Sequence, residues 1–110
     1  MGVHDGHRER VRRRFLKNDL SGFADHEALE LLLYYAIPQG DVNPLAHELM
    51  DRFGSLSAVL SAPVELLTEV RGVGERTAVL LRLSLLIALN PKDEYPEARA
   101  MRRHFTLHLG

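Results

Sequence analysis

The sequence predicts an all-α fold, a compact helical domain of about six or seven helices. Apolar residues recur at helical spacing among charged ones, and proline or glycine stands where most of the helical stretches end. No segment shows the convincing apolar and polar alternation of a half-buried strand. With 110 residues, 45% apolar and 26% charged, the chain suffices for one domain with a hydrophobic core, which excludes a disordered tail.

The first two predicted helices differ in how much surface they must bury. Residues 8–18 form a modestly amphipathic helix, because their apolar side chains stand four and five positions apart among charged ones. Residues 25–37 have almost no polar face apart from Glu30, so this helix must be buried nearly all round. Asp25 is placed to cap its N-terminus, and Pro38 to stop it.

Three shorter helices are predicted in the middle of the chain. One starts after Asp41 and closes at Gly54, because glycine adopts the left-handed C-terminal conformation at low cost. Ser55 is placed to cap a short helix after it. Pro63 suits a first helical position and opens a helix over 64–70.

The last predicted helix runs from Arg76 to about residue 90, where Pro91 ends it. We therefore expect a helical domain over 1–90, followed by a linker and tail over 91–110. His104 and His108 in the tail would share a helix face, but two ligands without a third do not predict a metal site.

Charge and composition exclude several classes of protein. The formal net charge of -1 is a cancellation, with balances of +4 over 1–17, -8 over 18–70 and +3 over 71–110. The absence of cysteine excludes a disulfide framework, a thiolate zinc site and a cysteine nucleophile. The N-terminus lacks an apolar signal-peptide core, and the apolar stretch 78–89 is too short to span a membrane. We expect a soluble, cytoplasmic protein.

The strongest candidate site is a turn between two helices that contains Gly72, Val73 and Gly74. Glycine permits positive φ and lets a ligand approach the backbone, so consecutive N–H groups can converge on one anion. The following helix adds its unsatisfied N–H groups and the positive end of its dipole. The candidate DNA-binding residues are Arg71, Gly72, Val73, Gly74, Arg76 and Thr77.

One residue within this turn and one beside it have further expected effects. Val73 is expected to turn inward against Leu66 and Leu67, whereas the carboxylate of Glu75 would repel a phosphate. Taken alone, a Gly-x-Gly between helices is also compatible with a tight turn that binds nothing.

Residues around the turn resemble the helix-hairpin-helix motif. The matching positions are Leu66, Leu67, Val70, Gly72, Val73, Gly74 and Ala78. Residues 53–60 resemble the first, degenerate hairpin of a tandem helix-hairpin-helix domain. Further strings upstream are similar to the N-terminal half of the bacterial RadC family of DNA-repair proteins, and they cover 6–10, 22–27, 30–38 and 41–46.

This resemblance implies a fold and a function. The fold would be a tandem helix-hairpin-helix core like domain 2 of RuvA, with the hairpin motif at 64–90. The function would be non-sequence-specific DNA binding within a repair or recombination protein, with no catalytic residue in this chain. By analogy with other such hairpins, a monovalent cation would be held by hairpin carbonyls, and partners would include other repair proteins.

Full-length relatives in that family also carry a metal-dependent JAB/MPN domain with a His-x-His zinc signature. His104 and His108 are four positions apart and do not match it. We therefore expect either an N-terminal fragment or a stand-alone relative, and a fragment of a metal-dependent hydrolase stays as a third interpretation.

Other features leave alternatives open. A second basic patch of Arg8, Arg12 and Arg13 would contact phosphate, or it is simply the solvated face of a helix. Tyr34 and Tyr35 lie within a leucine run and are expected to pack in the core in preference to stacking on bases. The apolar excess in 78–89 and 29–37, together with the acidic middle of the chain, also fits a protein-interaction or dimerisation module without DNA contact.

Overall fold

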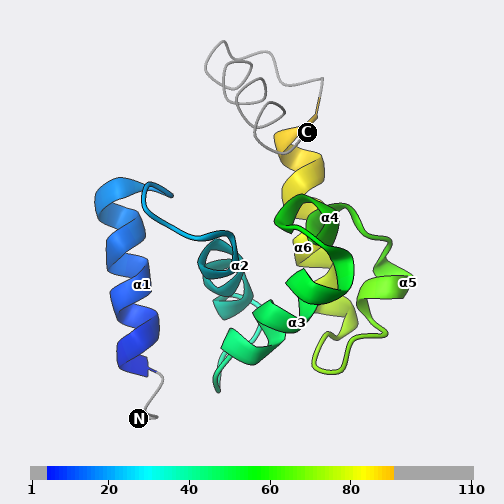
Figure 1. The fold of residues 1–110 in the computed structure, drawn as a ribbon, viewed down its shortest axis with the longest axis horizontal. Helices are drawn as coiled ribbons and strands as arrows, with labels where there is room; N and C mark the ends of the chain where they lie inside the picture. Colours follow the sequence, from blue (N-terminus) through cyan, green and yellow to red (C-terminus); the bar gives the residue numbers. More distant parts are fainter. Residues whose placement is uncertain (1–4, 91–110) are drawn as a thin grey trace. The chain divides into compact units, whose positions relative to one another are not determined.

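The computed structural model describes residues 5–90, and all regular structure in that range is helical, as predicted. The described residues form six helices, shown in Figure 1: α1 (Asp5–Asn18), α2 (Asp25–Tyr34), α3 (Asn43–Phe53), α4 (Leu56–Ser61), α5 (Val64–Leu67) and α6 (Glu75–Ala88). None of these helices is long and apolar enough to cross a membrane. The predicted tail over 91–110, with both of its histidines, lies outside the described residues.

The helical region divides into two compact units after Ser55. The first unit contains α1, α2 and α3, and the second contains α4, α5 and α6. The domain boundary expected at residue 90 coincides with the edge of the described residues and stays a prediction.

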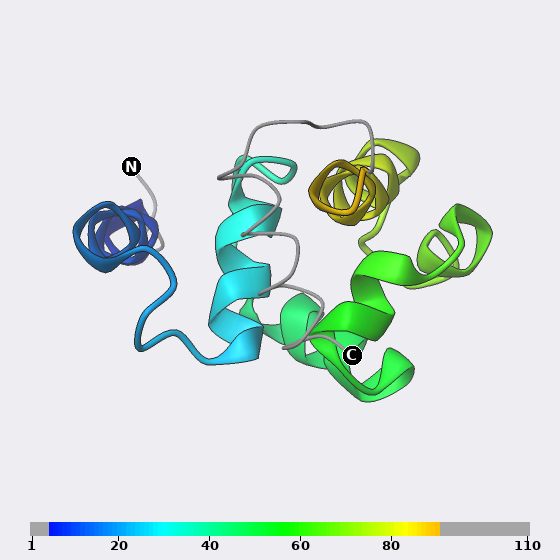
Figure 2. The same cartoon turned by 90° about the horizontal axis from the view of Figure 1, so that it is seen from above.

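In the first unit, α2 packs against both α1 and α3. Figure 1 shows α1 along its length and α2 nearly end-on, whereas Figure 2 shows the reverse, so these two helices cross steeply. Every α2 side chain from His26 to Tyr34 is buried or partly buried, which confirms the prediction for this helix. Tyr35, just beyond it, is 71% exposed, so its expected place in the core is wrong.

The ends of α2 differ from the predicted ones. Ala24, not Asp25, has the extended backbone of the N-cap, and its N–H donates to Oε1 of Glu27 at 3.0 Å. Asp25 is already helical, so it cannot cap. The helix ends at Tyr34, although the N–H of Ile37 still donates to the carbonyl of Leu33 at 2.8 Å.

In the second unit, α6 packs against α4 and α5. The guanidinium of Arg82 on α6 also donates to the carbonyl of Ser61 at the end of α4. Pro63 is the N-cap of α5, with ψ of 145°, and not its first helical residue as predicted. α5 ends at Leu67, before the predicted end at residue 70, and is only one turn long. The chain continues through turns over 68–72, where the N–H of Val70 donates to the carbonyl of Leu67.

Glycine predicted the C-terminus of α3, and serine predicted the N-terminus of the helix after it. α3 ends as predicted, because Gly54 follows it with the left-handed φ of 98°. The cap assigned to Ser55 stays a prediction.

Candidate nucleic-acid interface

The turn between α5 and α6 needs glycine at one position only. Gly72 has a φ of 99°, which side-chain-bearing residues rarely adopt. Gly74 has φ of -85° and ψ of 177°, so the positive φ allowed for both glycines occurs only at Gly72. A Cβ atom added at Gly74 would meet nothing within 4 Å. Neither backbone conformation nor crowding by the described residues therefore explains glycine at position 74.

Some backbone N–H groups of the turn donate to a carbonyl of the chain, and others have no acceptor within the described residues. The N–H of Val73 donates to the carbonyl of Val70 at 3.0 Å and is not free for a ligand. Gly74 is the N-cap of α6 and offers no side-chain acceptor. Within residues 5–90, the N–H groups of Gly74, Glu75 and Arg76 donate to no protein acceptor. These unsatisfied donors lie at the N-terminus of the longest helix of this unit.

Two other helices in the chain cover such donors with carboxylates. Glu27 accepts from the N–H of Ala24 at the start of α2, and Asp41 accepts from the N–H of Asn43 at 3.0 Å at the start of α3. Within residues 5–90 the start of α6 has no equivalent, and the carboxylate of Glu75 in its first turn is exposed and forms no described hydrogen bond. The site is therefore open to an external anion.

The side chains predicted for this site separate into exposed and buried ones. Arg71 and Arg76 are exposed, whereas Val73 and Thr77 are each 5% exposed. The inward turn of Val73 is confirmed. Because Thr77 lies in the interior of the unit, the two arginines are the exposed side-chain donors beside the turn.

Of the two leucines predicted to lie against Val73, only one is buried. Leu67 is fully buried, but Leu66 is exposed, because α5 is a single turn that presents only one side to the unit. Leu66 therefore lies outside the core that supports the turn.

The turn also exposes carbonyl oxygens. In the described part of the chain, the carbonyls of Arg71 and Gly72 accept no hydrogen bond. Both belong to exposed residues. The cation stays a prediction.

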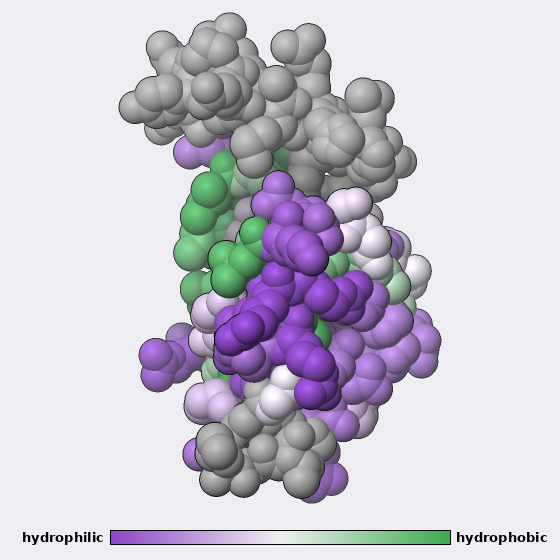
Figure 3. All heavy atoms as spheres, turned by 90° about the vertical axis from the view of Figure 1, so that its left-hand side faces the viewer, coloured by the Kyte–Doolittle hydropathy of each residue, from purple (hydrophilic) through white to green (hydrophobic). Residues whose placement is uncertain are grey.

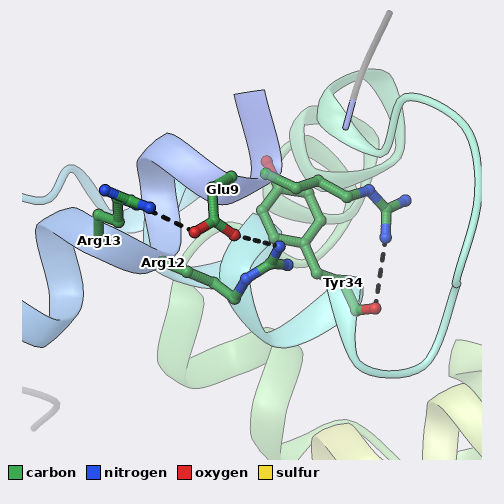
Figure 4. Close-up of polar contacts among 5 residues, drawn as sticks. Glu9, Arg12, Arg13 and Tyr34 are labelled. Carbon is green, nitrogen blue, oxygen red and sulfur yellow. Dashed lines mark hydrogen bonds and ion pairs between the residues drawn. The ribbon is translucent and has the colours of Figure 1, made fainter. Parts of the chain in front are cut away.

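The second predicted basic patch is not assembled as expected. Figure 3 views the side on which α1 lies, and the surface there is mostly hydrophilic. Arg8 is nevertheless only 5% exposed, because its guanidinium donates to backbone carbonyls at the end of α2. Arg12 and Arg13 both bind the carboxylate of Glu9, at 2.8 and 3.0 Å (Figure 4). These two hydrogen bonds lower the pKa of Glu9.

The sequence did not indicate several contacts within the first unit. Arg14 donates to Glu27 at 2.7 Å and lies over the ring of Phe23, at 4.4 Å from its centroid. The hydrogen bond from Arg14 lowers the pKa of Glu27, and the hydrogen bond from the N–H of Ala24 lowers it further by a smaller amount. The rings of His26 and His47 stack with centroids 4.5 Å apart. No cluster of three potential metal ligands occurs within the described residues.

Comparison with known proteins identifies similar chains. The UPF0758 protein SPO0054 of Ruegeria pomeroyi is 46% identical over 97 residues, which cover 88% of this chain and 42% of that protein. The UPF0758 protein FN0909 of Fusobacterium nucleatum is 44% identical over 80 residues, which cover 73% of this chain and 34% of that protein. No family model and no solved structure matches the chain.

The region of similarity is thus most of this chain but less than half the length of these relatives. At 44% and 46% identity, the similarity reflects common ancestry. The chain therefore has homologues among the UPF0758 proteins.

Proposed function

We propose that this chain is a non-sequence-specific DNA-binding module of a RadC-type repair or recombination protein, which holds the phosphate backbone at the turn between α5 and α6. One observation carries the proposal. The N–H groups of Gly74, Glu75 and Arg76 have no acceptor within the described residues, and a Cβ atom added at position 74 would meet no described atom within 4 Å. The RadC assignment rests on the resemblance of the sequence and on the UPF0758 homologues.

Each part of the turn has a distinct role in this proposal. Gly72 lets the chain reverse, and the buried Val73 anchors the turn to the unit. The free N–H groups at the start of α6 and the positive end of its dipole bind a phosphate oxygen. The absence of a side chain at Gly74 lets the phosphate reach those groups. Arg71 and Arg76 add charge from either side of the turn.

The chemistry of this site predicts binding without sequence preference. Backbone N–H groups and arginines directed at phosphate oxygens position DNA but do not distinguish bases. The carboxylate of Glu75 opposes the same phosphate, so the interaction is weak and sensitive to salt. We propose no catalytic step for this chain. The module would act in the cytoplasm, where other repair proteins or a JAB/MPN domain of a longer relative supply further activity.

The experiment is a salt titration of DNA affinity for the full chain, read by fluorescence anisotropy on duplex, single-stranded and branched DNA. Arg76→Glu and Gly74→Asp are compared with Arg10→Glu, which makes the same charge change as Arg76→Glu but on the exposed face of α1. Losing one phosphate contact should make the slope of log K against log salt shallower by about 0.9 on duplex DNA. Both hairpin variants should show this change and bind more weakly, whereas Arg10→Glu should retain the wild-type slope.

Two results would overturn the proposal. One is no binding to any of the three DNA forms at low salt. The other is an equal loss of affinity in Arg10→Glu and Arg76→Glu, because this would indicate attraction by overall charge alone.

A further inference from the structure

α6 carries an apolar face without a partner within the described residues. The exposed apolar side chains of α6 and its C-cap, each 40–62% exposed, are Val79, Leu83, Leu86, Ile87 and Leu89. Val79, Leu83 and Leu86 stand four and three positions apart, the spacing by which helices pair. No charged residue occurs from Leu83 to the end of α6, and Arg82 is engaged with Ser61. Scattered exposed leucines are ordinary, but a continuous uncharged stripe on one helix indicates an interface.

We propose that this face binds a second copy of the chain, with the two α6 helices antiparallel across a two-fold axis at Leu83. In that register Val79 of each copy lies opposite Ile87 of the other, so apolar side chains meet apolar ones. A parallel arrangement would instead place Arg76 opposite Arg76 and Glu75 opposite Glu75. Antiparallel pairing separates the two Arg76 positions by about 21 Å along the axis and opposes the helix dipoles.

The available area fits a weak dimer. Half-exposed aliphatic side chains offer roughly 80 Å² each, so five of them on two copies remove about 800 Å² of apolar surface from water. Because homodimer interfaces are about 65% apolar, the whole interface would bury about 1,200 Å². This area lies at the lower limit for a specific interface. A neutral stripe offers no attraction to a phosphate backbone, so this face is separate from the proposed DNA site.

The first test is the mass of the full chain by sedimentation equilibrium, up to about 100 μM. We expect a concentration-dependent rise from 12.4 kDa toward twice that value. Leu83→Arg brings two like charges together at the two-fold axis and should abolish the rise. Leu16→Arg changes an exposed leucine of α1 in the same way and should associate like the wild type. A wild-type mass of 12.4 kDa throughout, or equal loss in both variants, would overturn the proposal.

Cysteine cross-linking tests the register independently, because the natural chain has no cysteine. Leu83→Cys alone should form a disulfide-linked dimer under mild oxidation. Val79→Cys and Ile87→Cys should cross-link only when mixed, and Leu16→Cys should not cross-link. Cross-linking of Val79→Cys with itself would indicate parallel helices, and the absence of any cross-link at these three positions would exclude the interface.

Discussion

The guanidinium of Arg8 on α1 lies over the ring of Tyr34 on α2, with its Cζ atom 4.6 Å from the ring centroid. Its Nη1 atom donates to the carbonyl of Tyr34 at 3.3 Å and to that of Ile37 at 2.6 Å, and Nη2 donates to Gly40 at 2.8 Å. These carbonyls lie at and beyond the end of α2, where a helix leaves carbonyls without internal partners. Arg8 therefore connects α1 to the segment that follows α2, which accounts for the burial of a charged side chain.

Replacing Arg8 with lysine should destabilise the first unit by about 2–3 kcal/mol. Lysine keeps the charge but not the planar fork that reaches three carbonyls at once, and hydrogen bonds to charged groups are worth about 1.5–3 kcal/mol each. The free energy of unfolding, measured by urea denaturation with far-UV circular dichroism, checks this expectation.

The matched control is Arg10→Lys, on the exposed side of the same helix. It should change the free energy of unfolding by less than about 0.5 kcal/mol. Equal stabilities for the two variants would contradict the role given to Arg8.

Replacing Tyr34 with phenylalanine should leave the protein as stable or raise its free energy of unfolding by about 1 kcal/mol. The hydroxyl of Tyr34 is buried and has no hydrogen-bond partner within the described residues. Oε1 of the buried Glu30 also has no partner there. Burial, with a contribution from the Glu30 carboxylate, raises the pKa of Tyr34. Removing this hydroxyl removes a desolvation cost without breaking a described bond.

Tyr35→Phe provides the control for that measurement, because Tyr35 is exposed and its hydroxyl should contribute little. A loss of more than about 1 kcal/mol in Tyr34→Phe would show instead that the buried hydroxyl is hydrogen-bonded, for example to a trapped water.

Local patterns predicted the helices well, because helix formation depends on neighbours within one or two turns. The near-complete burial of α2 followed from its run of leucines, and the end of α3 from Gly54. The burial of Arg8 could not be predicted, because its acceptors lie 26, 29 and 32 residues away. In the sequence, Arg8 looks like any member of the basic stretch that contains it.

In the candidate site too, the features set by neighbouring residues could be predicted and those set by the packing of the chain could not. The turn and the inward position of Val73 followed from local glycine chemistry. Local chemistry could not predict which N–H groups of the turn stay free. That depends on whether the N–H of Val73 donates to the carbonyl of Val70. Thr77 could not be assigned to the interior until the face that α6 turns toward its unit was known.

The stability of the first unit should fall in acid, partly through Glu27. The hydrogen bond from Arg14 at 2.7 Å holds the pKa of Glu27 below its usual value. Its contribution is therefore complete above the unfolded pKa, near 4.3, and is lost as pH falls through the lower folded pKa. Glu27→Gln should cost about 0.5–1 kcal/mol at pH 7, and the difference from wild type should vanish at the acid end.

Urea denaturation at a series of pH values from neutral to about pH 3 measures this difference. Glu48→Gln, an exposed carboxylate on α3, should follow the wild-type pH dependence. If the Glu27→Gln difference did not change with pH, ionisation of Glu27 would not be its source.

Gly72→Ala and Gly74→Ala should separate stability from DNA binding. At Gly72 the φ of 99° strains any side chain, so alanine should cost about 1–2 kcal/mol of folding free energy. At Gly74 the backbone suits alanine and the added Cβ meets no atom within 4 Å. There, a loss of unfolded-state freedom and a poorer N-cap oppose each other, so stability should stay within about 0.5 kcal/mol of wild type.

Anisotropy and urea denaturation on the same preparations should show that Gly74→Ala binds DNA more weakly at unchanged stability. Wild-type affinity in Gly74→Ala would mean that no phosphate approaches the start of α6 closely enough to meet a methyl group.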